Sequence, residues 1–342
     1  GKLPGFLREN YPDGKSDLFA AFMEVPYVKR NGMLAMINQH SWMFLSSFER
    51  LRKNIISNKT IINMLHLGPK AFEEIGGEVV QSTAFILRER HIKEYKSVFI
   101  RLVEIKDAQE KENEMLLAKS NKNDVYFVTM VDNFKAIPGM PIAYWISDRF
   151  INCFNRGTLL GKIAETRLGM ATADNDRFTR YWYEVNINKC GFNYSSRIEA
   201  QNSGKKWFPY NKGGEFRKWY GNNYILVNWE NDGFEIRNYK DEKTGRIRSH
   251  NYNLDYIFKE GLTWTFVSSS CFGIRYFPQG FLFDVGGSSM FMSNKKIKYI
   301  LGYLSTKITF ETLKVFNPTL TFQPGNLCNL PIIFSDGKFA EI

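Results

Sequence analysis

The chain has 342 residues, of which 44% are hydrophobic and 24% charged, an ordinary globular composition. This length suits two domains, each able to bury its own core. No run of about 18 apolar residues occurs, so we expect no membrane-spanning helix and no membrane association. The cysteines form no CxxC pair and match neither a zinc site nor a disulfide framework, which favours a cytoplasmic protein with buried thiols: Cys153, Cys190, Cys271 and Cys328.

The net charge of +11 is distributed unevenly. Residues 149–220 carry thirteen Lys and Arg against six Asp and Glu, whereas residues 108–148 are slightly acidic. A localised basic excess is what a phosphate-binding surface requires. Charge alone fits a phosphate-binding surface and a generally basic protein equally well. The four histidines are scattered along the sequence, which indicates single packed or surface side chains rather than a metal site.

The first hundred residues alternate helical and strand patterns. Ser16 can cap one helix, and Ser46 or Ser47 can cap a second one. Strands are predicted over residues 33–38, 60–67, 79–87 and 97–104, and the first two are short apolar runs typical of buried parallel strands. This alternation predicts an α/β fold with parallel pairing. Two helix–strand units are too few for an independent sheet, so this domain is either cut short or supported by another element.

Residues 106–124 are polar, highly charged and without a strand pattern, which predicts a linker. We therefore expect domains at 1–107 and 125–342, with residues 108–124 between them. The second domain begins with a strand over 125–131 and continues from Arg156 with alternating aromatic and Gly/Asn-rich pieces. These predict irregular β structure with long loops, followed by a helix over 297–306. The tail 317–332 is expected to be extended because its prolines disfavour a helix.

Several long motifs resemble a known family. The stretches at 16–22, 31–44, 48–56, 61–68 and 71–87 are similar to the second half of an amino-methylating adenine DNA methyltransferase: SDLFAAF, NGMLAMINQHSWMF, FERLRKNII, IINMLHLG and AFEEIGGEVVQSTAFIL. Three later stretches resemble, more narrowly, the adenine methyltransferases of BREX phage-exclusion systems: RLGMATADNDRFTRYWYEV, KKWFPYNKGGEFRKWYGN and VFNPTLTFQPGNLCNLPI.

The resemblance implies a partial Rossmann-like methyltransferase sheet and an α+β target-recognition domain. It also implies S-adenosylmethionine as the cofactor of the parent enzyme. The family's Asn-Pro-Pro-Tyr loop and Gly-rich cofactor loop do not occur here, and NPTL at 317–320 is no substitute, having one proline and no following aromatic residue. In the family, the Asn side chain and a proline carbonyl accept the hydrogens of the target amine, while the Tyr stacks on the flipped base. We therefore expect both loops to lie upstream of Gly1. We also expect this fragment alone to be inactive and to bind no cofactor.

Phe72 is the one residue of this first domain that the resemblance places beside the flipped adenine. It stands in a loop rich in glycine after a buried strand, a position at the rim of a cleft. A loop phenylalanine packed into the core is an equally good interpretation. Gly76 and Gly77 permit a close backbone approach or a simple turn.

The second domain resembles the recognition domains of restriction-modification specificity subunits, whose task is to hold phosphates and read base edges. Around the turn at 168–178, Arg177 and Arg180 can pair with guanine or with phosphate, and Asn175 can pair with adenine. A capped helix start at Asp174 or Asn175 explains the same residues. Arg167, just before the turn, is a candidate for a phosphate contact.

Basic residues interleaved with aromatic ones suit nucleic acid, and residues 203–221 show this pattern. Its candidates are Lys205, Lys206, Lys212, Arg217 and Lys218. We expect the aromatic side chains to pack and the cations to meet the DNA backbone, although lysines solvated outside a core fit the pattern too. Farther on, Arg275 can face DNA, but packed β structure explains most of its segment.

The leading hypothesis is a fragment of a site-specific adenine-N6 DNA methyltransferase of a phage-defence system, in which the fragment mainly recognises double-stranded DNA. The alternative is a non-catalytic DNA-specificity or scaffold module that binds DNA or other defence proteins. A methylase fused to a nuclease is a third interpretation, although no Pro-Asp…Glu-x-Lys pattern occurs in this sequence.

Overall fold

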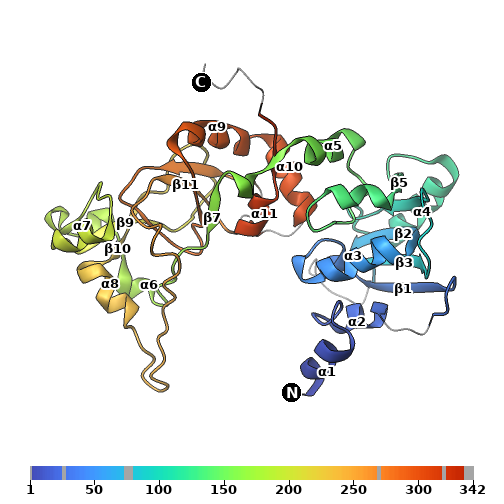
Figure 1. Ribbon diagram of the computed structural model, residues 1–342, viewed down its shortest axis with the longest axis horizontal. Coiled ribbons are helices and arrows are strands. Elements are labelled where there is room, and N and C mark those ends of the chain that lie inside the picture. The colour runs from blue at the N-terminus through green and yellow to red at the C-terminus, as the bar shows by residue number, and fades with distance from the viewer. Residues whose placement is uncertain (1, 25–27, 73–79, 268–270, 318–320, 335–342) are drawn as a thin grey trace. The chain divides into compact units, whose positions relative to one another are not determined.

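The computed structural model describes residues 2–24, 28–72, 80–267, 271–317 and 321–334. The chain forms two compact units, unit 1 (Gly1–Arg156) and unit 2 (Gly157–Ile342). The division therefore falls some thirty residues beyond the predicted linker. No helix in the described part of the chain combines the length and the hydropathy that a bilayer-spanning segment needs. Figure 1 shows the elements of each unit.

Unit 1 is a five-stranded sheet with helices. Its strands are β1 (Met33–Gln39), β2 (Thr60–Pro69), β3 (Gln81–Arg88), β4 (Lys96–Arg101) and β5 (Tyr126–Met130). Its α-helices are α1 (Lys2–Asn10), α2 (Leu18–Glu24), α3 (Glu49–Asn58), α4 (Ala108–Asn121) and α5 (Asp148–Arg156). Short 3₁₀ helices are η1 (His40–Met43), η2 (Ser46–Phe48) and η3 (Val131–Ala136).

The strand order β1-β3-β2-β4-β5 differs from the expected parallel pairing. β3 returns antiparallel after β2 and lies between β2 and β1, so that β1 and β2 run in the same direction without touching. Among the described strands of unit 1, only β2 and β4 pair in parallel. The helix–strand alternation predicted the direction of β1 and β2 correctly, but it holds no information about a later strand that inserts between them.

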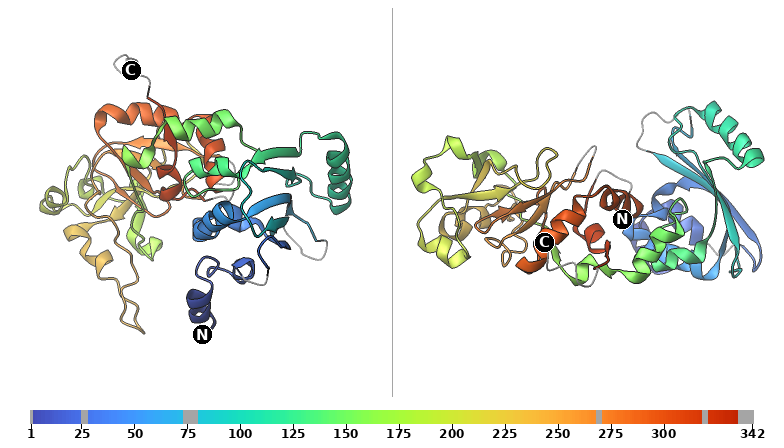
Figure 2. Two further views of the ribbon diagram at one scale, coloured as in Figure 1. Left: turned by 45° about the vertical axis from the view of Figure 1, so that its right-hand side comes forward. Right: turned by 90° about the horizontal axis from the view of Figure 1, so that it is seen from above.

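The predicted buried strand at 33–38 is instead an exposed edge of the sheet. Exposed and half-buried residues alternate along β1, and the side chains of Met33 and Ile37 are 60% and 58% exposed. The opposite face of the sheet packs on α3, whose Leu51, Ile55 and Ile56 are buried as their helical spacing predicted. Figure 2 shows this sheet from two further sides.

The predicted linker is a helix that belongs to unit 1. Asp107 accepts a hydrogen bond from the backbone N–H of Glu110 and caps α4, and Ala118 packs against Ile100 and Leu102. β5 then pairs with β4. Lys111 explains how so polar a segment folds onto the sheet. Its buried ammonium donates to the carbonyl oxygens of Leu67, Leu102 and Ile105 at 2.6, 2.9 and 2.5 Å.

Unit 2 consists of short strands joined by long loops, as predicted. One sheet has the order β13-β9-β10-β8, a second β12-β11-β14-β7, and a third pairs β15 with β6. Its strands are β6 (Thr158–Leu159), β7 (Glu165–Arg167), β8 (Thr179–Tyr181), β9 (Trp207–Asn211), β10 (Ile225–Asn228), β11 (Gly261–Trp264), β12 (Ile274–Phe277), β13 (Leu282–Phe283), β14 (Ser289–Phe291) and β15 (Pro331–Ile332). Its helices are α6 (Asn175–Phe178), α7 (Arg197–Asn202), α8 (Glu230–Arg237), α9 (Asn294–Leu304), α10 (Lys307–Phe316), α11 (Pro324–Cys328), η4 (Leu160–Lys162), η5 (Trp182–Glu184) and η6 (Ile187–Lys189).

The core of unit 2 is aromatic. Phe208, Tyr210 and Trp229 are buried in one cluster with Phe258 and Phe277. Gly169 permits the close approach of the segment that carries Met170, since a Cβ there would lie 2.3 Å from the carbonyl oxygen of Phe283. The aromatic half of the 203–221 prediction thus holds for Phe208 and Tyr210. Trp219 and Tyr220 are exposed instead.

Two predictions for the end of unit 2 had different outcomes. The helix expected over 297–306 is α9, and Ile297, Ile300 and Leu304 are buried. The tail expected to be extended contains the helix α11, which begins at Pro324. A proline is tolerated at the first position of a helix because its missing N–H would have no partner there.

Replacing Lys111 by methionine should destabilise unit 1. The variant leaves three carbonyl oxygens without their shared donor, which costs about 1–3 kcal/mol per unsatisfied buried group. We expect a loss of at least about 3 kcal/mol in the free energy of unfolding, measured by urea denaturation. The exposed Lys119 of the same helix, changed to methionine, is the control. Equal effects of the two substitutions would contradict the role given to Lys111.

Candidate nucleic-acid interface

The turn at 172–178 is built by side chains that bond to one another. Asp174 accepts a hydrogen bond from the backbone N–H of Arg177 at 3.0 Å and caps α6, so the helix-start interpretation is confirmed for Asp174. The Oδ1 atom of Asn175 accepts from the hydroxyl of Thr172 at 2.8 Å and from the ammonium of Lys212. The oxygen of Asn175 is therefore already engaged inside unit 2.

Arg177 is held by a carboxylate. Its Nε and Nη2 atoms donate to Oε1 of Glu235 at 2.9 and 2.7 Å, and these hydrogen bonds raise the pKa of Arg177. The guanidinium also lies over the rings of Phe178 and Tyr239, at 5.3 and 5.1 Å from their centroids. Both charge and stacking face are thus occupied.

Arg180 and Arg167 are also engaged. Arg180 donates to the backbone oxygens of Asp176 and Thr179 and lies 5.8 Å from the ring centroid of Trp207. Arg167 forms an ion pair with Glu165, donates to the Tyr256 hydroxyl at 2.7 Å and stacks over that ring. Arg167 thus has a carboxylate partner, whereas Arg180 has none within the described structure.

The lysines of the 203–221 segment have similar partners. Lys205 donates to the backbone oxygen of Asn188 at 2.6 Å, and Lys218 donates to that of Ser305 at 2.8 Å. Lys206 and Lys212 lie 3.5 and 3.7 Å from carboxylates, those of Glu230 and Asp284 respectively. Burial lowers the pKa of Lys212, and Asp284 opposes that shift.

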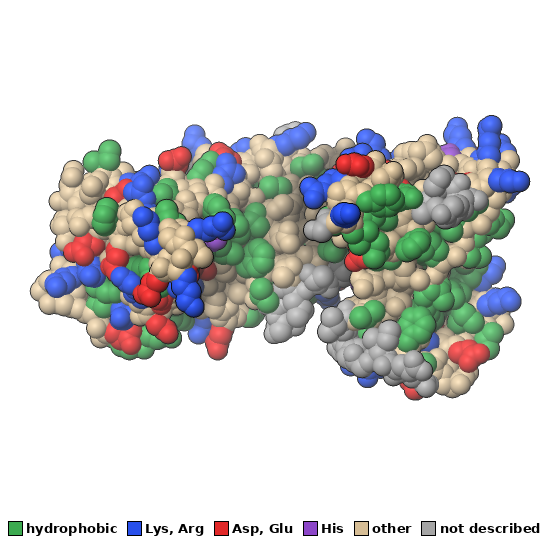
Figure 3. All heavy atoms as spheres, turned by 90° about the horizontal axis from the view of Figure 1, so that it is seen from below, with side chains coloured by type: hydrophobic (Ala, Val, Ile, Leu, Met, Phe, Trp, Pro, Cys, Tyr) green, Lys and Arg blue, Asp and Glu red, His purple; other side chains and the backbone are tan. Residues whose placement is uncertain are grey.

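Arg217 is different from these lysines. Its side chain is exposed, and no ion pair to it exists within the described residues. Figure 3 shows one face of the molecule, on which the basic side chains of unit 2, at the left, are interspersed with acidic ones. The basic excess of the sequence thus does not form one continuous positive field on that face.

Arg275 is not a surface residue, which corrects its prediction as a DNA contact. It lies in β12, is 1% exposed and donates to the Thr265 hydroxyl at 3.4 Å. Burial lowers its pKa to about 10. The alternative of packed β structure accounts for this arginine, since strand β12 places it inside unit 2.

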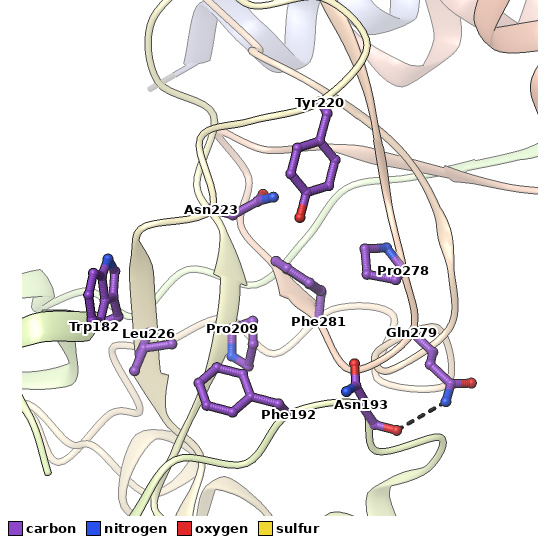
Figure 4. A pocket seen from close by; sticks show the side chains of 10 residues that line it. All are labelled: Trp182, Phe192, Asn193, Pro209, Tyr220, Asn223, Leu226, Pro278, Gln279 and Phe281. Carbon is purple, nitrogen blue, oxygen red and sulfur yellow. Dashed lines mark hydrogen bonds between the residues drawn. The ribbon is translucent and has the colours of Figure 1, made fainter. Parts of the chain in front are cut away.

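Unit 2 also has an aromatic pocket of about 390 Å³ (Figure 4). Trp182, Phe192 and Tyr220 are exposed by about half and form parts of its wall. Gln279 donates to the backbone oxygen of Asn193 at 3.0 Å across its rim. This pocket can take a flat apolar group, and no basic candidate residue lines it.

Unit 1 brings together two histidines that the sequence pattern did not associate. His40 Nδ1 lies 2.8 Å from His66 Nε2, and His66 Nδ1 lies 2.9 Å from the Tyr144 hydroxyl. They stand at or near the end of the sheet where β1, β2 and β4 have their carboxyl ends, the edge at which ligands bind in α/β sheets. The two histidines lie 26 positions apart in the sequence, so no short spacing motif indicates the pair.

The positions of the protons in the hydrogen-bonded series Tyr144–His66–His40 can be assigned from the hydrogen-bond partners. Burial raises the pKa of Tyr144, so its hydroxyl stays protonated and donates to His66 Nδ1. His66 then donates from Nε2 to His40 Nδ1, which leaves an N–H on Nε2 of His40. Burial, with the nearby charge of Arg101, lowers the pKa of His40 to about 4. Burial, with the nearby His40 and Arg101, lowers the pKa of His66 well below its usual value. No group of three or more metal-ligating side chains occurs among the described residues.

Phe72 lies three residues beyond β2, at this same end of the sheet, and its side chain is 45% exposed. The core-packing interpretation therefore does not apply to it. Gly76 and Gly77 lie outside the described residues. A depression of about 340 Å³ on the open face of the sheet is lined by apolar side chains with Asn63 as the polar exception. This lining does not fit S-adenosylmethionine, because the cofactor carries a sulfonium, a ribose and an amino acid.

Comparison with known proteins defines the class. Residues 4–72 match the family model described as Eco57I restriction-modification methylase. The fold is similar to a solved structure of the Type IIL restriction-modification enzyme MmeI in complex with DNA, with a TM-score of 0.57 at 12% identity. The alignment covers 96% of this chain and 44% of the MmeI chain. That is a likeness of fold. Residues 4–72 thus carry the sequence signature of a restriction-modification methylase, and the chain is similar in fold to one restriction-modification enzyme.

Two curated proteins are similar along the whole chain. It is 44% identical over 342 residues to the Adenine-specific methyltransferase PglX of Lacticaseibacillus casei (strain Zhang), and 42% identical over 339 residues to the Adenine-specific methyltransferase BrxX of Escherichia coli O9:H4 (strain HS). Each alignment covers 97% of this chain, and 28% and 26% of the relatives. The resemblance to phage-exclusion adenine methyltransferases is confirmed, and the chain spans about a quarter of their length.

The histidine pair predicts a stability loss in mild acid. The folded-state pKa of His40, about 4, lies below the unfolded value of about 6.5. The unfolded chain therefore binds more protons as the pH falls from about 6.5 to 4, and stability falls by about 3 kcal/mol across that window.

The measurement is urea unfolding as a function of pH, with the substitution His40→Asn. This variant should show a flatter pH dependence between pH 4 and 6.5 than the unmodified chain. His250→Asn changes an exposed histidine and is the control. If the pH dependence of stability were the same in the His40 variant, the assignment of neutral His40 and His66 in the folded state would be contradicted.

Proposed function

We propose that the chain is part of a site-specific adenine-N6 DNA methyltransferase of a phage-defence system, in which unit 2 holds duplex DNA. The observation that carries the proposal is the identity of 42–44% to adenine-specific methyltransferases over 97% of the chain. The likeness of fold to a restriction-modification enzyme solved in complex with DNA supports the DNA-binding part. S-adenosylmethionine is the cofactor of the proposed parent enzyme, bound by residues other than those described here.

Unit 1 has features that suit part of a larger methyltransferase domain. β1 has an unpaired edge within the described structure and exposes Met33 and Ile37, an arrangement that a soluble sheet ordinarily covers or pairs. We propose that further strands of the parent enzyme continue the sheet at β1. Phe72, at the carboxyl end of the strands, would then contact the flipped adenine.

A stacked aromatic edge is suited to this role of Phe72. A base that leaves the duplex loses its stacking energy, and contact with an aromatic or apolar side chain restores part of it. The exposure of Phe72 in unit 1 leaves its ring free for such a contact.

A non-catalytic DNA-specificity or scaffold module is the second candidate. The sequence observation that favours it is the lack of an Asn-Pro-Pro-Tyr loop in these 342 residues. Both candidates bind duplex DNA, and they differ in whether the whole protein methylates adenine. Methylation of adenine by the complete protein, detected by mass spectrometry of digested DNA, would decide for the enzyme.

Duplex binding by the full chain should depend on salt. The logarithm of the binding constant should fall linearly with the logarithm of salt concentration, measured by fluorescence anisotropy, because bound cations release counterions from DNA. Arg217→Ala should flatten that slope by about 1. Lys314→Ala removes the same charge from an ion pair with Glu311 and should leave the slope unchanged. A salt-independent affinity would contradict the proposal.

The chain should bind no S-adenosylmethionine by itself. Calorimetric titration of the cofactor into the 342-residue chain should give no binding heat, because the depression on the open face of the unit 1 sheet has an apolar lining that does not suit the sulfonium and the ribose. A dissociation constant in the micromolar range would show that this chain forms the cofactor site alone. The same titration into the complete protein is the positive control.

A further inference from the structure

A basic hairpin, residues 239–249, follows α8 and projects from unit 2 (Figure 1). Its two arms are joined by hydrogen bonds from Asp241 N to Arg246 O and from Arg248 N to Tyr239 O, both 2.8 Å. At the tip, the carboxylate of Asp241 accepts from the backbone N–H of Lys243 and Thr244 at 3.1 and 2.9 Å. Gly245 closes the turn with a φ of +66°. The tip is therefore a defined turn.

The base of the basic hairpin is fixed to unit 2. Ser249 is buried and donates to the backbone oxygen of Ile236 at 2.6 Å. Ala171 and His250 exchange two backbone hydrogen bonds of 2.8 and 2.9 Å, which tie the hairpin to the turn at 172–178. The Tyr239 hydroxyl donates to Asp174 at 3.1 Å, and Arg248 lies 5.2 Å from the Tyr239 ring centroid. The hairpin thus projects from a rigid base.

Several cations of unit 2 have no ion-pair partner in the described structure, and three of them stand on this hairpin. Residues 239–249 contain four cations and two acids, and Asp241 is engaged by the backbone of the turn. Lys240, Lys243 and Arg246 are exposed, and the described structure gives them no ion-pair partner. This separates them from Arg177, Lys206 and Lys212 in the same unit, whose charges face carboxylates.

The size of the basic hairpin matches a groove of DNA. Five residues separate Ser249 at the base from Thr244 at the tip, which gives a reach of roughly 16 Å at about 3.3 Å per residue. The major groove of B-DNA is about 12 Å wide and about 8.5 Å deep, and it admits a two-stranded β-ribbon. A hairpin of this length can therefore reach base edges while its base stays at the level of the phosphates.

We propose that the basic hairpin enters the major groove of duplex DNA and that Arg246 contacts a base edge there. The proposal rests on the function proposed above for unit 2, and it names the segment of unit 2 that recognises the DNA sequence. The guanidinium of Arg246 has five donors in a planar fork, the geometry that pairs with guanine O6 and N7. Lys240 and Lys243 hold phosphates on either side of the groove, and the exposed Ile247 offers an apolar contact to a thymine methyl group.

The test is enrichment of binding sites from a randomised duplex library by the full 342-residue chain, followed by affinity measurements on the enriched site. Arg246→Ala should weaken binding to that site roughly tenfold to a hundredfold and remove the preference at one base pair. Arg246→Lys should keep the salt dependence but weaken that preference, because an ammonium is a flexible point charge without the planar fork of a guanidinium. Lys243→Ala should weaken all duplexes alike and flatten the salt slope by about 1.

Lys298→Ala, an exposed lysine on α9, is the control, and thermal melting checks that each variant folds. Hairpin variants that behave as this control, while the unmodified chain still enriches a site, would overturn the hairpin proposal and leave the proposed function standing. Uniform weakening by Arg246→Ala would overturn the base-reading role. An unmodified chain that binds no duplex would overturn both proposals.

Discussion

Ion pairing within unit 2 decides which of its positive charges remain for a ligand. A cation that faces a carboxylate contributes little to the field outside the protein, and moving it to a phosphate first requires breaking the pair. Arg177 with Glu235 and Lys212 with Asp284 are such cases. Arg217 and the cations of the basic hairpin have no such partner among the described residues. The proposed DNA contacts therefore depend on a few side chains and not on the overall charge of +11.

The same ion pairing also gives the two groups of residues different roles. The paired residues hold a neighbouring element in place, and the unpaired cations are available to contact DNA. The engaged residues of the turn at 172–178 hold the base of the hairpin, since Asp174 both caps α6 and accepts from Tyr239. Tyr239 in turn lies beneath the guanidinium groups of Arg177 and Arg248. The residues that the sequence suggested for DNA contact thus build the support of a neighbouring element. A rigid support keeps the entropy cost of binding low, because less motion is lost when the ligand arrives.

The sequence allowed good prediction where local pattern determines structure. The helical spacing of Leu51, Ile55 and Ile56 and the apolar run at 60–67 gave α3 and β2 nearly at their observed bounds. Prediction from the sequence failed where contacts with residues far along the chain determine the structure. The insertion of β3 beside β1, the three carbonyl partners of Lys111 and the burial of Arg275 each depend on contacts that no local window contains. The linker prediction failed because charge was taken as a sign of a loop, whereas one buried lysine fixes that helix to the sheet.

The candidate site shows the same limit. Residue type and spacing suggested the basic, aromatic segments as candidates, and the family resemblance suggested Phe72. Neither could show that most of those cations have internal partners or that His40 and His66 meet. The basic hairpin had a readable turn signal in Asp241, Thr244 and Gly245, yet its projection from unit 2 is visible only in the folded chain.

Hydrogen exchange with mass spectrometry on the full chain, with and without a saturating DNA duplex, tests the central claim most directly. The account predicts slower exchange over residues 172–180 and 239–250 when the duplex is bound, with little change in α9 and α10. Protection confined to the aromatic pocket around Trp182 and Tyr220, or no protection anywhere in unit 2, would contradict it.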